Sequence, residues 1–156
     1  MVEQGRPILA CGCFASYSYS MDPGLRVLAD CFAPVCTLVG KTWSLHLEKV
    51  LRVSREENLA IITESIAFLV SAGKRVIYDA EHFFDGYRDD PAYALACLRA
   101  AVAGGAETVV PCDTNGSSMP WEIEAAITDV VSQLGDHVRV GIHCHDDAGC
   151  GVAVDA

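Results

Sequence analysis

With 156 residues, of which 51% are hydrophobic, the chain is long and apolar enough to predict one globular domain with its own core. Its formal net charge of -10 at pH 7 argues against nucleic acid and against an anionic membrane surface as partners. We find no apolar run of membrane-spanning length, and the N-terminus has no basic leader followed by an apolar core. We therefore expect a cytoplasmic protein.

Five short apolar runs predict strands that are buried on both faces, as in a parallel sheet. They cover residues 7–12, 33–40, 74–80, 107–113 and 137–143. Most of the eight cysteines lie in or beside such apolar runs, where a reduced thiol acts as a small hydrophobic side chain rather than as half of a disulfide.

Three helices are predicted between the later runs, each with a start and a stop signal. Ser54 and Glu57 form a capping box, and proline or aspartate opens the other two helices. The first helix is expected to begin at Ser54 and end at Gly73, the second to run from Asp90 to Gly104, and the third from Pro120 to Gly135. The strand and helix order predicts an α/β protein with about five parallel βα units in a single domain over residues 1–156.

Polar residues gather where the predicted strands end, in "GKTWSLH", "DAEHFFDG", "CDTNG" and "HCHDD". In a parallel α/β protein these ends share one face, where ligands bind. We therefore expect the four polar loops to converge on one site.

His143 and His145 stand two apart in a predicted strand, so their side chains point the same way and can reach one cation. The alternative is a hydrogen-bonded structural pair.

Glu81 and Asp79 likewise share a strand face, where a carboxylate could serve as a base, a metal ligand or a substrate contact, or be a solvated loop acid. Thr114 offers a hydroxyl from a turn, and His46 is either a helix-entry residue or a substrate contact.

Four stretches together resemble a known family in order and spacing: "GKTWSLHLEKVLRVSREENL", "VIYDAEHFFDGYRDDPAYALACLRAA", "CDTNG" and "GIHCHDDAGC". They are similar to the catalytic barrel of citramalate synthase, in the family that includes isopropylmalate synthase and hydroxymethylglutaryl-CoA lyase. The resemblance runs over residues 34–150 and is weak over residues 1–33.

This resemblance implies a partial (βα)8 TIM barrel and a metal-dependent Claisen condensation of acetyl-CoA with a 2-oxo acid, pyruvate, in branched-chain amino-acid biosynthesis. It implies a divalent metal ion (Mg, Mn or Zn) with His143 and His145 as ligands. By the same resemblance Glu81 is catalytic, and His46 and Thr114 contact the substrate.

The family's Arg-Asp pair on the first strand is missing, and about 250 residues are needed to close such a barrel. We therefore expect a section of the barrel that is inactive alone and that self-associates or pairs with a complementary barrel fragment. The alternatives are an isopropylmalate synthase, a carbon-carbon lyase of the same barrel family, and a non-catalytic remnant or assembly subunit.

Overall fold

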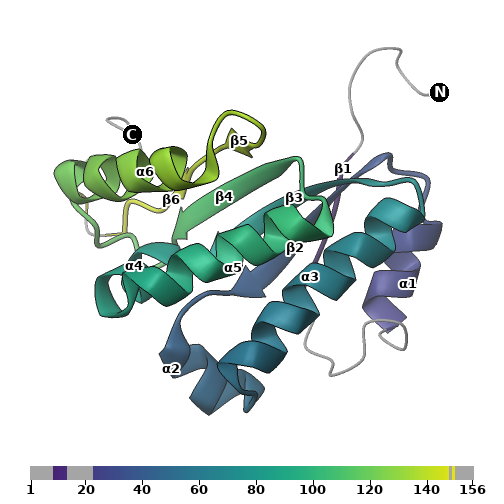
Figure 1. Ribbon diagram of the computed structural model, residues 1–156, viewed down its shortest axis with the longest axis horizontal. Coiled ribbons are helices and arrows are strands. Elements are labelled where there is room, and N and C mark those ends of the chain that lie inside the picture. Colours follow the sequence, from purple (N-terminus) through teal and green to yellow (C-terminus); the bar gives the residue numbers. More distant parts are fainter. Residues whose placement is uncertain (1–8, 14–22, 148, 150–156) are drawn as a thin grey trace.

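The computed structural model describes residues 9–13, 23–147 and 149, and its centre is one parallel sheet (Figure 1). Strands β1 to β5 are neighbours in chain order, and every pair is parallel. A short sixth strand continues along β4 beyond β5. The strands are β1 (Leu9–Cys13), β2 (Val35–Lys41), β3 (Arg75–Glu81), β4 (Thr108–Asp113), β5 (Arg139–Val140) and β6 (His143–Cys144). The predicted α/β class and parallel order are confirmed.

The last predicted strand is interrupted. The run over residues 137–143 forms β5 and β6, and the chain leaves the ladder at Gly141 and Ile142 between them. Both pieces pair with β4. His143 therefore begins a new short strand instead of ending the old one.

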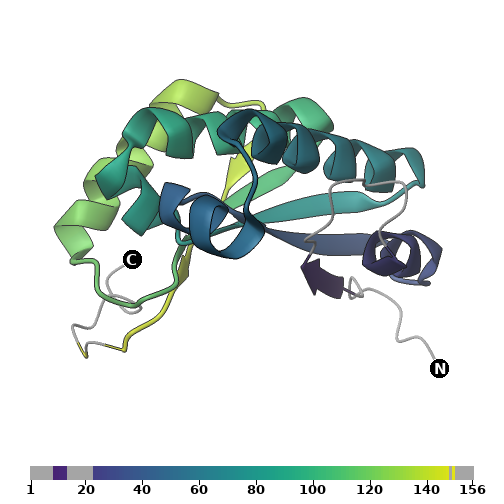
Figure 2. The same ribbon diagram turned by 90° about the horizontal axis from the view of Figure 1, so that it is seen from below.

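The main helices cover one face of the sheet. They are α1 (Pro23–Asp30), α2 (Ser44–His46) with the π-helical turn η2 (Leu47–Leu51), α3 (Arg55–Ser71), α4 (Phe83–Asp89), α5 (Pro91–Gly104) and α6 (Pro120–Leu134). Figure 2 shows α3, α5 and α6 on the same side of the strands. Helices α3, α5 and α6 match the three predicted ones.

The start of α3 carries both bonds of the predicted capping box. The Ser54 hydroxyl accepts from the Glu57 N–H at 3.1 Å, and the Glu57 carboxylate accepts from the Ser54 N–H at 2.7 Å. These bonds satisfy two donors that a helix start leaves without an intrahelical partner.

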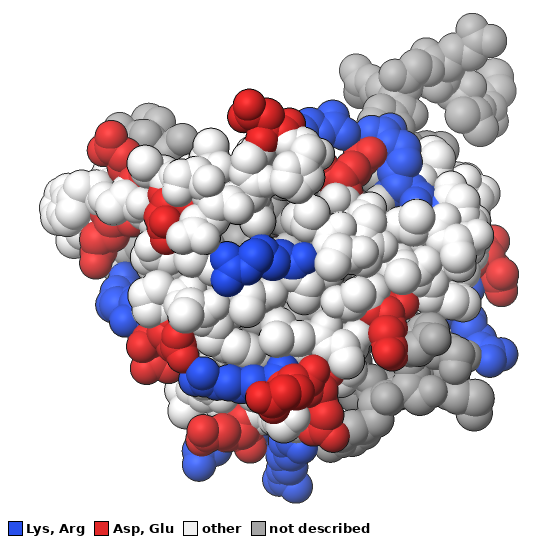
Figure 3. All heavy atoms as spheres, in the orientation of Figure 1, with Lys and Arg blue, Asp and Glu red and all other residues white. Residues whose placement is uncertain are grey.

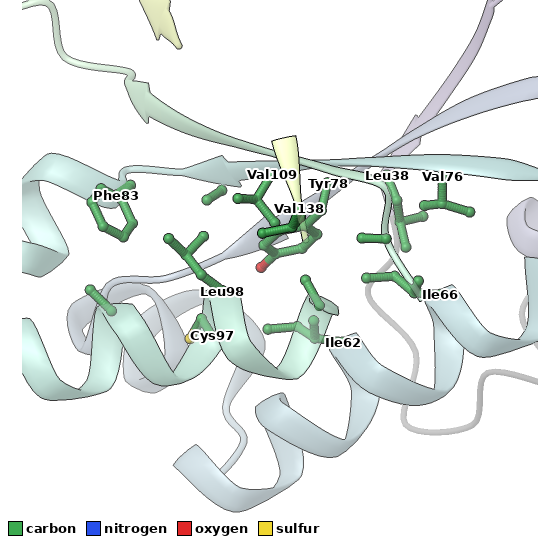
Figure 4. Packing of buried hydrophobic residues seen from close by; sticks show 14 of the residues in the cluster. Leu38, Ile62, Ile66, Val76, Tyr78, Phe83, Cys97, Leu98, Val109 and Val138 are labelled. Carbon is green, nitrogen blue, oxygen red and sulfur yellow. The ribbon is translucent and has the colours of Figure 1, made fainter. Parts of the chain in front are cut away.

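The hydrophobic core fills the space between the sheet and the helices (Figure 4). Tyr78 and Val76 of β3 meet Ile62 and Ile66 of α3, and all four are almost completely buried. Because strand side chains alternate, the residues between them turn toward the opposite face. That face carries Asp79 of β3, which is only partly buried.

Helix α4 lies in the stretch "DAEHFFDG", where the sequence predicts a polar loop. Phe83 and Phe84 are 0% and 4% exposed, so the stretch anchors itself in the core. A Cβ on Gly86 would lie 2.6 Å from the Thr42 carbonyl oxygen, so only glycine lets α4 pack this closely against the end of β2. The loop prediction is wrong here because buried aromatic residues outweigh the polar ones.

On the helix-covered face acidic and basic side chains are interspersed rather than gathered into a basic stripe (Figure 3). Glu107 accepts two hydrogen bonds from Arg75, at 2.7 and 2.9 Å, and its carboxylate lies 3.0 Å from the Arg139 guanidinium. Within the described residues, none of the helices has the length and apolar character needed to cross a membrane.

Candidate metal and substrate site

The ends of β2, β3, β4 and β6 lie at one edge of the sheet because the strands are parallel. The register places Lys41 opposite Glu81 and Cys112 opposite His143. The predicted site residues all stand at this edge or in the segments that follow it.

His143 faces a carboxylate and a thiol. Its Nδ1 lies 3.6 Å from Asp79 Oδ2 and 3.9 Å from Cys112 Sγ. One donor atom from each of these three residues lies within 4.8 Å of the other two. We call this group the Asp79–Cys112–His143 cluster. Cys112 was not among the predicted site residues, because the sequence places it in an apolar strand without showing which strand lies beside it.

His145 lies next to His143, as the spacing predicts. The two ring centroids are 5.0 Å apart, with the planes tilted by 30°. The backbone N–H of His145 donates to the backbone carbonyl of Asp113 at 3.2 Å. Asp79, Cys112 and His143 therefore offer a carboxylate, a thiol and an imidazole near one place on the sheet, with His145 beside His143. Carboxylate and imidazole are ligands that a divalent cation accepts.

Glu81 forms an ion pair with Lys41 across the β2–β3 ladder. Their side chains are 26% and 24% exposed, so the pair is mostly shielded from water. Asp79 stands two residues before Glu81 on the same strand face, and this links the ion pair to the Asp79–Cys112–His143 cluster. The sequence alone did not single out Lys41, which only the register of the two strands makes a partner of Glu81.

His46 lies among aromatic side chains that follow β2 and β3. Its ring centroid is 4.3 Å from that of His82 and 5.2 Å from that of Trp43. Its Nδ1 is buried and has no hydrogen-bond partner within the described residues. Burial lowers the pKa of His46, and the neighbouring His82 and Lys41 lower it further. The carboxylates of Glu81 and Asp85 oppose this shift, but the net direction of the His46 pKa is downward.

Thr114 joins the ends of β3 and β4. Its hydroxyl accepts from the His82 N–H at 2.8 Å, and His82 adopts a left-handed conformation with φ of 58°. The His82 side chain also contacts Asp85, with 3.1 Å between His82 Nδ1 and Asp85 Oδ2. Asn115 donates to the same Asp85 oxygen at 2.9 Å.

Asp113 has the ordinary turn role that the sequence suggests for "CDTNG". Its completely buried carboxylate accepts from the Ser118 N–H and from the Ser118 hydroxyl, each at 3.0 Å. Gly116, with φ of 60°, lies so close to the next loop that a Cβ would be 2.7 Å from the Asp147 nitrogen. The turn after β4 therefore supports the segment that carries His145.

The structure thus brings the predicted residues together in two adjoining groups. His143 belongs to the Asp79–Cys112–His143 cluster, His145 lies beside His143, and Glu81 follows Asp79 by two residues on β3. His46 and Thr114 contact His82, on the other side of Glu81.

Comparison with known proteins agrees with this architecture. The chain is 45% identical over 132 residues to an (R)-citramalate synthase of Streptomyces coelicolor, covering 85% of this chain and 24% of that protein. A Synechocystis (R)-citramalate synthase is 50% identical over 138 residues, which cover 85% of this chain and 25% of that protein. A 2-isopropylmalate synthase of a Synechococcus species is 34% identical over 137 residues, which cover 83% of this chain and 24% of that protein. The chain therefore spans about a quarter of the length of these relatives.

Among solved structures, the HMG-CoA lyase of Bacillus subtilis superposes with a TM-score of 0.78 at 16% identity, covering 97% of this chain and 49% of that one. This likeness confirms the predicted partial TIM barrel. A sequence model of the family described as HMGL-like matches residues 21–155, beyond both ends of the stretch 34–150 expected from the motifs. The predicted resemblance is confirmed, and the chain belongs to the HMGL-like family.

Proposed function

We propose that this chain is a section of the catalytic barrel of a citramalate synthase-type acyltransferase, which condenses acetyl-CoA with pyruvate. The observation that carries the proposal is the convergence of His143, His145 and Glu81 at one sheet edge, in a chain up to 50% identical to proteins named (R)-citramalate synthase. Such a biosynthetic role also accords with the expected cytoplasmic location.

His143 and His145 would hold the divalent cation, with Asp79 as an adjacent carboxylate ligand. When bound there, the cation acts as a Lewis acid toward the keto oxygen of the 2-oxo acid. Support comes from the donor set itself, since imidazole and carboxylate are ligands that Mn²⁺ and Zn²⁺ accept.

Glu81 is the proposed proton acceptor. Its carboxylate takes a proton from the methyl group of acetyl-CoA, and the resulting carbanion attacks the keto carbon of pyruvate. Water then cleaves the thioester and releases CoA. Lys41 orients the Glu81 carboxylate through their ion pair, so Lys41 is a positioning residue in this scheme.

His46 and Thr114 are the proposed substrate contacts. Thr114 accepts a bond from the His82 N–H, which leaves its own O–H able to donate to a substrate oxygen. The buried Nδ1 of His46 is without a partner within the described residues, and a bound substrate could supply one.

A chimera tests the function. Residues 21–155 of this chain would replace the matching segment of the Synechocystis (R)-citramalate synthase, and CoA release would be followed with pyruvate and acetyl-CoA. We expect turnover in the chimera and in its His137→Ala control, since His137 is exposed and precedes β5, at the opposite end of the sheet from the site residues. Turnover should be lost in the Glu81→Gln and His143→Ala chimeras.

Other results would favour the alternatives. Preference for a longer 2-oxo acid would indicate an isopropylmalate synthase, to which this chain is 34% identical in the Synechococcus relative. Cleavage without condensation would indicate a lyase. A folded chimera without any turnover would support a non-catalytic chain.

The isolated 156-residue chain is a different case, and we infer that it is inactive and self-associates. Helix α6, β5 and the segment before β6 border an apolar groove of about 620 Å³. Trp121, Val131 and Ile142 line it and are 66%, 45% and 37% exposed. Water solvates such a surface poorly, so a second copy is the proposed cover.

A further inference from the structure

We propose that Cys31 and Cys36 form a peroxide-reactive dithiol that closes into a reversible disulfide. Both cysteines are free thiols in the structure, and they stand where the chain turns from α1 into β2. Figure 1 shows α1 at one end of the sheet and α4 and β6 at the other, so this dithiol lies away from the candidate metal and substrate site. The inference therefore goes beyond the proposed function and does not rest on it.

The two thiols lie against the turn between α1 and β2. The Cys31 thiol donates to the Ala33 carbonyl at 3.9 Å, and the Cys36 thiol donates to the Leu28 carbonyl in the last turn of α1 at 3.8 Å. The side chains of Cys31 and Cys36 are also in hydrogen-bonding contact with each other. Residues 31–34 form a bend between the helix and the strand. A disulfide joins its sulfurs at about 2.0 Å, and side-chain rotations beside this bend would bring two contacting thiols to that distance.

The two sulfurs differ in their access to solvent. Cys31 is only partly buried and is followed by Phe32, whose side chain is 83% exposed. Cys36 is 0% exposed and belongs to the hydrophobic core, against which Cys31 packs. Burial raises the pKa of the Cys36 thiol, and the contact with Cys31 raises it further, against the opposing charge of Lys74. Cys31 is therefore the sulfur that an oxidant meets first, and Cys36 is the second thiol, which reacts with it.

Lys74 places a positive charge beside the accessible sulfur. Its Nζ lies 4.0 Å from Cys31 Sγ. The same ammonium donates to the Cys31 carbonyl and, at 3.0 Å, to the Ala33 carbonyl, and these two bonds keep it at the turn. Reactive cysteines are found in partly exposed, electropositive surroundings of this kind, because a nearby cation stabilises the attacking thiolate.

The proposed oxidation consumes one molecule of a hydroperoxide, here hydrogen peroxide. The Cys31 thiolate attacks one peroxide oxygen, the O–O bond breaks, a sulfenic acid forms, and the proton that Cys31 gave up completes the first water. The Cys36 sulfur then attacks the Cys31 sulfur, the S–O bond breaks, and the departing hydroxide takes the Cys36 proton to become the second water. The two thiols thus lose two hydrogens and two electrons, and the peroxide is reduced to two waters.

Peroxide treatment of the folded 156-residue chain, followed by trypsin digestion and mass spectrometry, tests the dithiol. Trypsin cuts after Arg26 and Lys41, so residues 27–41 form one peptide that carries Cys31 and Cys36 and no other cysteine. After a small excess of hydrogen peroxide we expect this peptide to be two hydrogens lighter and to take up no iodoacetamide. A phosphine reductant should restore both reactive thiols.

Cys97 gives an internal control, because it is 0% exposed and is the one cysteine of the tryptic peptide formed by residues 89–99. This peptide should keep its thiol. Cys36→Ser should leave a Cys31 sulfenic acid that dimedone traps, whereas Cys31→Ser should leave Cys36 unoxidised. Lys74→Gln keeps an N–H donor but removes the charge, and should slow the loss of the Cys31 thiol roughly threefold to fivefold.

Three results would overturn the proposal. The first is a wild-type peptide 27–41 that still takes up two iodoacetamide groups after peroxide treatment. The second is loss of the Cys97 thiol at the same rate, which would show that the reaction follows unfolding of the chain. The third is a dimedone adduct at Cys36 in Cys31→Ser as large as the one at Cys31 in Cys36→Ser. The first two readouts use the wild type alone, so they decide the matter even where a variant fails to fold.

Discussion

Gly116 is the point at which two loops of the candidate site touch. Replacing it with alanine forces a φ of 60° on a residue with a Cβ and drives that Cβ to 2.7 Å from the Asp147 nitrogen and 3.0 Å from the His145 carbonyl oxygen. We expect Gly116→Ala to lower the free energy of unfolding by roughly 1 kcal/mol or more beyond the cost of the left-handed backbone alone.

Urea unfolding measures this effect, and Gly73→Ala is the matched control. Gly73 has φ of 81°, but a Cβ added there would meet nothing within 4 Å. Its variant therefore adopts the strained backbone conformation without the close contact. Equal losses in the two variants would show that the loops do not press on each other at Gly116.

His46 makes stability depend on pH. Its pKa is lowered in the folded chain, mainly by burial, so the unfolded chain binds a proton more readily. The contribution of His46 to the free energy of unfolding is therefore complete above its unfolded pKa of about 6.5. This contribution is lost as the pH falls from there toward the lower pKa of the folded chain. His46→Gln should flatten this part of the stability curve.

Unfolding measured between about pH 8 and about pH 5.5, on either side of the ordinary histidine pKa, checks the His46 prediction. His137→Gln is the control because His137 is exposed. If the free energy of unfolding still falls with pH in His46→Gln but no longer does so in His137→Gln, then His137 and not His46 causes the pH dependence.

At the residue scale, strand alternation was enough to predict that His143 and His145 lie together, which the ring contact of 5.0 Å confirms. Their roles as metal ligands stay a prediction. Lys41 and Cys112 could not be found in the same way, because their partners stand 40 and 31 residues away along the chain and depend on strand register.

The elements depend on local signals that can be weakened one at a time. Ser54→Ala removes the hydroxyl that accepts the Glu57 N–H at the start of α3. We expect a loss of about 1 kcal/mol in the free energy of unfolding, measured with urea. Ser54→Asp keeps an acceptor at the cap and should retain most of the stability; a similar loss in both variants would mean that the cap contributes little.

At the element scale, the sequence predicted what periodicity and capping encode: the strands, their parallel order, and helices α3, α5 and α6. It did not predict α4, where the buried Phe83 and Phe84 outweigh the polar residues around them. It also did not predict the break between β5 and β6, because "HVRVGIH" has an unbroken strand pattern.

The apolar groove beside α6 gives a prediction for the whole molecule. Analytical ultracentrifugation of the isolated chain should find dimers or larger species at micromolar concentration, and Trp121→Glu should shift the chain toward monomer. Val27→Glu is the control, because Val27 is 68% exposed on α1, outside the groove. A wild type that stays monomeric would contradict the proposed second copy.

The central claim is that the strand-end histidines bind a divalent cation. Calorimetric titration of the isolated chain with Mn²⁺ at neutral pH measures this binding directly. We predict measurable binding by the wild type and by His137→Ala, whose altered side chain is exposed and away from the site, and none by His143→Ala or His145→Ala. Equal heats of binding for the wild type and His143→Ala would contradict metal ligation and leave the two histidines with a structural role.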